Sequence, residues 1–256
     1  MKIRILGGHN VETNNTSCNS ILIDDVLAVD AGALTTRLSF KEQQDLKAIL
    51  LTHQHYDHVK DIPMLGMNLF LQGKTTELYT TRHIYDTLEA RLFDDSLYPD
   101  FTKFPPEKPI LHFNEVEPGK IANIADYSVL PVKVKHSVPS VGYQITSPDR
   151  KKVFITSDTG PGLEECWEQI SPDLLFIEAT LPNKDEAFTV QAGHLTPALV
   201  QKELESFLKI KAYLPQVIVV HVNPLHEKVI KDEVSQVEKA LDIKIRIGYE
   251  GMQIKI

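Results

Sequence analysis

The chain has 256 residues, of which 42% are hydrophobic and 24% are charged, and its formal net charge is −8. This length allows a large buried core and favours one α/β domain over residues 1–256 rather than two small ones. The acidic balance argues against a large nucleic-acid footprint, because binding phosphates relies on a basic face, although a local basic patch stays open.

The sequence carries no pattern typical of secretion or of membrane insertion. The apolar run within residues 1–8 is too short for a signal peptide, and no other run approaches the length of a membrane span. Two cysteines, Cys18 and Cys166, give neither a disulfide framework nor a cysteine metal site, so reduced, packed thiols are expected. We therefore expect a soluble, cytoplasmic protein.

The first third of the chain predicts strands and then helices. Short apolar runs predict strands at 2–6, at 20–23, at 26–30 after a tight Asp24-Asp25 turn, and at 48–51. Apolar residues at helical spacing predict helices at 38–46, 59–71 and 82–93.

Residues 94–109 interrupt this pattern. Four prolines there forbid regular structure, while Tyr98, Phe101 and Phe104 indicate that the segment packs on something. A lid over a site, a dimer arm and a plain connector all fit, so a homodimer is a further option.

The second half alternates in the same way. Strands are predicted at 110–115, 127–136, 142–146, 152–156, 174–178, 217–221 and 244–247, with helices near 163–169, 197–208 and 227–241. Strand clusters followed by helices, twice over, predict two packed sheets with helices outside.

The most informative stretch is Thr52-His53-Gln54-His55-Tyr56-Asp57-His58, directly after the apolar run at 48–51. His53 and His55 alternate, so both imidazoles can project the same way from extended backbone. Asp57 and His58 then turn toward a neighbouring point. One such turn can serve two metal ions that activate water for hydrolysis. A histidine-rich surface loop is the simpler alternative.

Three further metal-competent residues each end a predicted strand: His136, Asp158 and His221. Rigid strand ends fix the positions of side chains, and chemistry collects there. A lone strand-end histidine is more often structural, but together with the cluster these residues indicate one shared site.

The order His53-x-His55-x-Asp57-His58, His136, Asp158, His221 resembles the metallo-β-lactamase superfamily, and Val29-Asp30-Ala31-Gly32 is similar to its usual strand and turn. The resemblance covers essentially the whole chain. It implies an αββα sandwich with a two-metal site at one edge. It further implies the ligands of each metal: His53, His55 and His136 for the first, and Asp57, His58 and His221 for the second, with Asp158 bridging.

Neutral imidazoles and carboxylates suit two divalent ions, with zinc favoured over manganese or iron. Asp30 either orients a ligand histidine from behind or closes the turn before Gly32.

Other stretches resemble the branch that holds the transfer-RNA 3′-processing endonucleases and the cyclic phosphodiesterases. These are His136–Tyr143, Ser157–Gly160, Glu178–Thr180, and Gly193–Pro197, the last closest to class II cyclic-nucleotide phosphodiesterases. The resemblance implies that His194, paired with Glu178, stabilises the scissile phosphate or protonates the leaving oxygen.

A structural role also stays open for this pair. His194 can be a helix-start residue, followed by Thr196 as the N-cap and Pro197 at the first helical position. Glu178 can be a plain strand-end carboxylate.

Two features depart from the family. Asp61 stands where the family often has glycine, and it either caps a helix or alters the mouth of the site. No long basic insertion rich in glycine and proline, of the kind that clamps transfer RNA, is evident. His9 is expected to be a surface or hydrogen-bonding residue, and His83, His112 and His226 are expected to be structural or exposed.

We therefore expect a dinuclear phosphodiesterase for a small phosphodiester such as a cyclic nucleotide, in which a metal-activated water attacks phosphorus, Asp57 helps orient or deprotonate it, and His194 assists departure. RNA 3′-end cleavage is an alternative. Carboxylic or thioester hydrolysis and a diiron redox or oxygen-binding protein are others. Diiron relatives usually place glutamate where this chain has His55, which disfavours the redox role.

Overall fold

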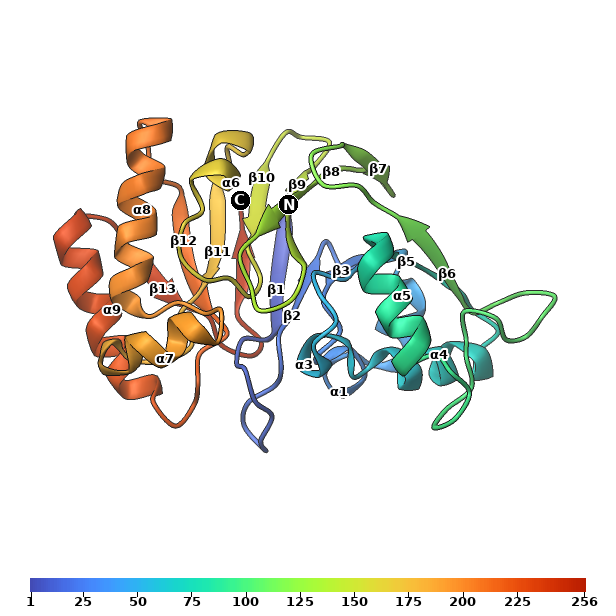
Figure 1. Ribbon diagram of the computed structural model, residues 1–256. Coiled ribbons are helices and arrows are strands. Elements are labelled where there is room, and N and C mark those ends of the chain that lie inside the picture. Colours follow the sequence, from blue (N-terminus) through green and yellow to red (C-terminus); the bar gives the residue numbers. More distant parts are fainter.

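The computed structural model describes residues 1–256 as two seven-stranded sheets with helices on their outer sides (Figure 1). The first sheet contains β1 (Lys2–Gly7), β2 (Ser20–Ile23), β3 (Leu27–Val29), β4 (Ala48–Leu50), β5 (Thr76–Thr80), β6 (Leu111–Glu115) and β14 (Gln253–Lys255). Its strand order is β14-β1-β2-β3-β4-β5-β6. β3 to β6 are parallel neighbours, so β3, β4 and β5 all end at the same edge.

The second sheet mirrors the first in size. It contains β7 (Ala122–Ile124), β8 (Tyr127–Val134), β9 (Ser140–Thr146), β10 (Lys152–Ile155), β11 (Leu174–Glu178), β12 (Gln216–Val220) and β13 (Ile245–Ile247). β10 to β13 are parallel, and β8 runs in their direction because β9 is antiparallel to both β8 and β10. The carboxyl ends of β8, β10, β11 and β12 therefore meet at one edge of this sheet.

The helices divide between the two outer sides. Those beside the first sheet are α1 (Leu34–Arg37), α2 (Phe40–Asp45), α3 (Tyr56–Val59), α4 (Ile62–Leu71) and α5 (Arg82–Arg91). Those beside the second are α6 (Glu164–Gln169), α8 (Pro197–Lys211) and α9 (Glu227–Leu241), while α7 (Glu186–Gln191) follows the short turn η1 (Asn183–Asp185). In Figure 1 the two helix groups flank the strands, so the predicted four-layer αββα sandwich is confirmed.

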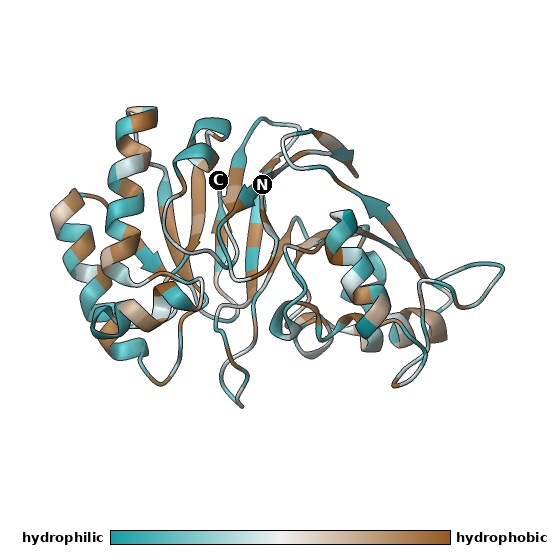
Figure 2. Cartoon of the chain, viewed as in Figure 1, coloured by the Kyte–Doolittle hydropathy of each residue, from teal (hydrophilic) through white to brown (hydrophobic).

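Three buried hydrophobic clusters fill the spaces between the layers. One cluster of 23 residues lies between the sheets, and the other two lie between each sheet and its helices. In β2, Ile21 faces the cluster between the sheets while Leu22 faces the helices. Because both faces of such strands are covered, they are apolar throughout, as the hydropathy colours of Figure 2 show for the central strands.

Several element boundaries differ from those predicted. The helix expected at 38–46 is α2 alone, which begins at Phe40 because Ser39 and Glu42 form a capping box, and the short helix α1 before it was not predicted. The helix expected at 59–71 is divided, since Pro63 stands in the first turn of α4.

The sequence analysis missed β5, β7, β14 and α7. β7 and β14 have only three residues each, and α7 has six, so none is long enough for a clear hydrophobic period. β5 carries Glu77 and two threonines and gave no continuous apolar run.

Residues 94–109 contain no helix or strand. Phe101 is buried and lies 6.2 Å, ring centre to ring centre, from Phe70 of α4, and Phe104 lies beside both. Leu97 is 88% exposed. The segment is therefore anchored by its aromatic residues, and its role as lid, arm or connector stays a prediction. No helix in the structure combines the length and the apolar character needed to cross a membrane.

Candidate metal centre

The predicted metal-binding residues come from strand ends of both sheets. His53 follows β4 in the first sheet, while His136, Asp158 and His221 follow β8, β10 and β12 in the second. The sandwich brings these ends together, so that residues up to 164 positions apart in the chain, Asp57 and His221, lie side by side.

The backbone is unusual where these strands end. Asp30, Ser157 and His221 all have positive φ, at 61°, 55° and 57°. Non-glycine residues adopt this region rarely and at a free-energy cost, and such strain concentrates at functional sites. At Gly32 a Cβ atom would lie 2.2 Å from the Asp57 carbonyl oxygen, so only glycine allows the chain to pass so close to the histidine cluster.

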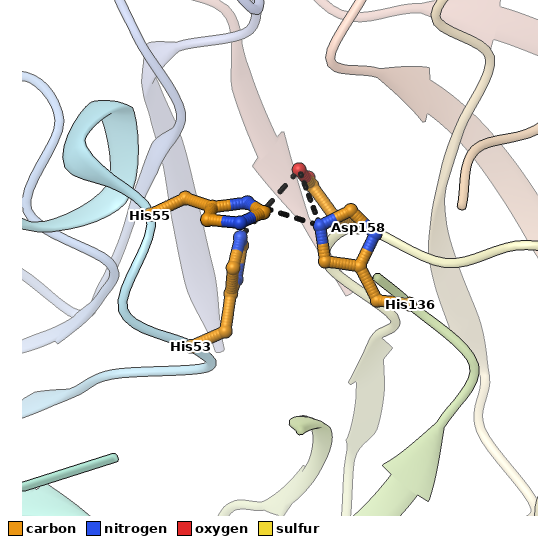
Figure 3. Close-up of side chains that lie close together, drawn as sticks. All are labelled: His53, His55, His136 and Asp158. Atoms are coloured by element: carbon orange, nitrogen blue, oxygen red, sulfur yellow. Dashed lines mark hydrogen bonds and ion pairs between the residues drawn. The ribbon is translucent and has the colours of Figure 1, made fainter. Parts of the chain in front are cut away.

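The first group of side chains comprises His53, His55, His136 and Asp158, and their ligand atoms lie within 4.8 Å of one another. Figure 3 shows the three imidazoles pointing toward one another and toward the carboxylate. His136 Nε2 lies 3.1 Å from His55 Nδ1, and His53 Nε2 lies 3.6 Å from Asp158 Oδ2. The group has the size and ligand types of a cation site.

The second group comprises Asp57, His58, Asp158 and His221, again within 4.8 Å. His58 Nε2 lies 3.2 Å from Asp158 Oδ1, and His221 Nε2 lies 3.3 Å from both Asp158 Oδ1 and Asp57 Oδ2. Asp158 belongs to both groups, with Oδ2 toward the first and Oδ1 toward the second.

Three buried atoms at the centre have no hydrogen-bond partner: His53 Nε2, His58 Nε2 and Asp158 Oδ1. Buried polar atoms without partners cost free energy, so a folded protein rarely keeps several together. Divalent cations would satisfy all three at once. The residues therefore fit the metal ions that this fold implies.

The acid–base properties of the first group's side chains agree, whereas in the second group burial is outweighed by the Asp158 and Asp30 carboxylates, which raise the pKa of His58 well above its usual range. Burial lowers the pKa of His53, His55 and His136, which favours neutral imidazoles. Burial raises the pKa of Asp158, but the neighbouring His221 and His58 outweigh it and hold the pKa well below its usual range. Neutral imidazoles and an ionised carboxylate are the forms that bind metals.

Behind the first sheet's ligands lies Asp30, which is fully buried. Its carboxylate accepts hydrogen bonds from His58 Nδ1 at 2.7 Å, from the Thr52 backbone and hydroxyl at 2.9 Å, and from Ser157 Oγ at 3.2 Å. Of the two roles open to Asp30, these contacts match the orienting one.

Glu178 occupies the corresponding place in the second sheet and is also fully buried. Oε1 accepts from His194 Nδ1 at 2.8 Å and from the Thr159 amide at 2.7 Å. Oε2 accepts from Thr180 Oγ1 at 2.6 Å and from the Leu195 amide at 3.1 Å. Both oxygens are therefore engaged by protein donors, and Glu178 is not free to act as a metal ligand.

His194 lies at the rim of the cluster. Its ring stacks on His221 with centroids 5.3 Å apart, and its Nδ1 lies 4.0 Å from Asp158 Oδ2. Burial lowers the pKa of His194, but the Glu178 carboxylate outweighs this and raises the pKa to about 9. The Glu178 carboxylate therefore favours the protonated form of His194, and Nε2 is the ring nitrogen not engaged by Glu178.

The segment before His194 also supports the cluster. His136 Nδ1 donates to the Gly193 carbonyl at 2.8 Å, which turns His136 Nε2 toward His55. Gly193 has φ +80°, and a Cβ there would lie 2.9 Å from His136 Nδ1. Thr196 does cap α8, accepting from the Leu199 amide, and Pro197 follows it, so the predicted helix start is correct.

The remaining singled-out residues lie outside the cluster. His9 is buried and bonds Glu250 at 2.7 Å, which fits the predicted hydrogen-bonding role. His83 is exposed, His112 pairs with Glu77, and His226 precedes α9.

One interpretation needs correction, and four contributions were missed. Asp61 precedes α4 without capping it, because its carboxylate instead accepts from the Thr35 amide at 2.7 Å and pairs with Lys60. Sequence reasoning did not find the supporting contacts of these residues: Thr52, Ser157, Thr180 and Gly193. All four adjoin or stand within the quoted motifs, but a hydroxyl or carbonyl contact leaves no pattern in a single sequence.

The fold, together with this cluster of histidines and aspartates at the edge of both sheets, defines a metal-dependent hydrolase of the metallo-β-lactamase class. Residues 19–222 match the family described as beta-lactamase superfamily domain, and the chain belongs to that family. The predicted membership of the metallo-β-lactamase superfamily is thereby confirmed.

Solved structures share the fold over the whole chain. Unliganded yeast PDE1 superposes with a TM-score of 0.87 at 18% identity, covering 100% of this chain and 99% of that one. YhfI from Bacillus subtilis gives a TM-score of 0.79 at 17% identity, covering 99% and 98%. Human tRNase Z, short form, gives 0.69 at 17%, covering 100% and 99%.

Two curated relatives match over only part of their own length. An octanoyltransferase of Porphyromonas gingivalis is 26% identical over 213 residues, 81% of this chain but 37% of that protein. Ribonuclease Z of Prochlorococcus marinus is 33% identical over 121 residues, 44% of this chain and 36% of that protein. The chain thus spans little more than a third of the length of these two relatives.

Proposed function

We propose that the cluster holds two divalent cations, most simply zinc. His53, His55 and His136 would bind the first, Asp57, His58 and His221 the second, with Asp158 between them. The support is the set of three buried ligand atoms that have no hydrogen-bond partner, together with the short distances from Asp158 to both groups. Imidazole and carboxylate ligands suit zinc, and manganese or iron are the other candidates.

We further propose that the chain is a phosphodiesterase for a small phosphodiester, such as a cyclic nucleotide. The observation that carries this proposal is the His194–Glu178 pair, which holds an imidazole beside the cluster through a hydrogen bond from Nδ1 to the carboxylate. Cleaving a phosphodiester releases a poor leaving group, an alkoxide, that needs a proton. A thioester leaves readily without one, so this pair would be superfluous for thioester hydrolysis.

The proposed mechanism assigns a task in catalysis to Asp57, His194 and Glu178. Divalent cations, when bound, supply Lewis-acid charge that activates water and offsets the charge on the phosphate. Asp57, which is 29% exposed, reaches into the site to orient the attacking water or accept its proton. His194 donates a proton to the leaving oxygen, and Glu178 holds His194 through Nδ1, so Glu178 acts through His194 and does not touch the substrate.

A small substrate is favoured over RNA by the net charge of −8. RNA 3′-end cleavage is the second candidate, supported by ribonuclease Z of Methanococcus maripaludis, which is 26% identical over 82% of this chain and 72% of that protein.

A substrate panel on protein of known metal content tests the proposal. The panel contains cyclic mononucleotides, linear dinucleotides, bis(p-nitrophenyl) phosphate, an RNA with a 3′ extension, and a thioester. Chelator-sensitive turnover that is fastest on a cyclic mononucleotide or dinucleotide supports the first candidate. Preference for the RNA supports the second, and turnover of the thioester alone overturns both.

A further inference from the structure

The two buried carboxylates behind the cluster make the same pair of contacts. Asp30, after β3 of the first sheet, accepts directly from His58 Nδ1. It also accepts from the Thr52 hydroxyl, which lies 3.1 Å from His53 Nδ1. Asp30 thus contacts one histidine directly and a second through a threonine.

Glu178, at the end of β11 of the second sheet, repeats this arrangement. It accepts directly from His194 Nδ1 and also from the Thr180 hydroxyl, which lies 2.8 Å from His221 Nδ1. The two sheets therefore carry matched relays, Asp30–Thr52–His53 and Glu178–Thr180–His221. Thr52 is fully buried and Thr180 is 4% exposed, so water does not compete for these bonds.

The chemistry of the hydroxyl fixes which ring nitrogen carries the proton. An ionised carboxylate only accepts, so we assign each threonine proton to the carboxylate, although Thr52 Oγ1 also lies 2.7 Å from Ser157 Oγ. The threonine oxygen can then only accept from the histidine, which places the imidazole proton on Nδ1. The lone pair of Nε2 is then available to a cation, and in both histidines Nε2 faces Asp158, at 3.6 Å from His53 and 3.3 Å from His221, where it also lies 3.3 Å from Asp57 Oδ2.

We propose that Thr52 and Thr180 are positioning residues that set the tautomers of His53 and His221, and that each prepares one of the two cation sites. The inference rests on the proposed metal centre and not on the identity of the substrate. His53 belongs to the first group and His221 to the second, so loss of one hydroxyl weakens one cation and spares the other.

The test measures cation binding to the full-length protein by competition with a chromophoric chelator, without any substrate. Thr52→Val and Thr180→Val remove the hydroxyl at nearly constant volume. Each is expected to weaken one of two binding steps by about 10- to 100-fold, the usual effect of losing an outer partner of a ligand histidine. The double variant is expected to weaken both steps.

Three controls separate a relay from packing. Thr52→Ser and Thr180→Ser keep the hydroxyl and are expected to bind cations as the wild type does. Thr80→Val removes an equally buried hydroxyl that bonds only the Leu51 carbonyl, at 2.9 Å, and is expected to leave both steps unchanged. Val variants that bind both cations normally, or Ser variants that fail as the Val variants do, would overturn the proposal.

A second measurement needs no variant. Nitrogen-15 shifts of the imidazoles in chelator-stripped wild-type protein report the tautomer directly, and Nδ1–H is expected for His53 and His221. Finding Nε2–H at either position overturns the relay. A protein that binds two cations through intact relays but cleaves no phosphodiester would refute the proposed function and leave this inference standing.

Discussion

At the scale of single residues, the proposed phosphodiesterase activity depends on His194. His194→Ala is expected to lower turnover of a cyclic nucleotide or dinucleotide by about 100-fold, as for loss of one positioned acid, while the metal content per chain holds. Turnover of bis(p-nitrophenyl) phosphate is expected to fall much less, because p-nitrophenolate leaves without a proton. Steady-state kinetics on both substrates, with metal analysis, measure the contrast.

His83→Ala is the matched control for that substitution, because His83 is exposed and outside the cluster. It is expected to leave both activities unchanged. Equal losses on the two phosphodiesters in the His194 variant would argue that His194 stabilises charge on the phosphate and does not donate a proton. No loss on either would remove His194 from the mechanism.

Individual residues show how far a single sequence reaches. The predicted ligands were visible because histidines and aspartates ending apolar strands form an unusual pattern. Thr52 and Thr180 were not, because their importance depends on partners elsewhere in the chain: Thr52 bonds Asp30, 22 positions away, and Thr180 bonds His221, 41 positions away. A hydroxyl has no such pattern of its own.

At the scale of elements, α2 depends on its capping box. Ser39 Oγ accepts from the Glu42 amide, and Glu42 Oε2 accepts from the Ser39 amide at 2.9 Å. Ser39→Ala is therefore expected to lower the free energy of unfolding by roughly 0.5–1 kcal/mol at pH 7. Urea denaturation at pH 7 measures this loss, and unchanged stability would contradict the cap.

The same cap predicts a pH dependence. A hydrogen bond from Arg4, with the Ser39 bonds, lowers the pKa of Glu42 from 4.5 to about 2. The charged form is stabilised by folding, so this contribution is complete above pH 4.5 and is lost as the pH falls toward 2. The difference in free energy of unfolding between wild type and Glu42→Gln is expected to shrink over that window. Glu168→Gln, at an exposed position, is expected to be as stable as the wild type throughout it.

Long elements were predicted better than short ones. β11 and α9 have the predicted bounds, because each carries enough apolar residues to define its period. Two of the three-residue strands, β7 and β14, are stabilised by pairing with β8 and β1. Such tertiary pairing cannot be predicted from the local sequence.

At the scale of the whole molecule, we propose that residues 1–256 form one domain, because the cluster between the sheets draws side chains from strands of both halves. The layer order was predictable from strand clusters followed by helices. The contact between strand tips of the two sheets was not, since it followed only from the family resemblance.

The cations are expected to stabilise the folded chain. They would bind the assembled cluster and not the unfolded chain, so saturation at 100 times the dissociation constant adds about 2.7 kcal/mol. Chelation is therefore expected to lower the melting temperature, and added zinc to restore it, in differential scanning calorimetry. A melting temperature indifferent to chelator would contradict a cation bound between the sheets.

The most direct measurement is anomalous X-ray diffraction from crystals of the metal-loaded protein, at the absorption edge of the metal found by elemental analysis. The account predicts two peaks, one enclosed by His53, His55 and His136 and one by Asp57, His58 and His221, with Asp158 reaching both. A single peak, or peaks elsewhere in a protein that retains activity, would contradict it.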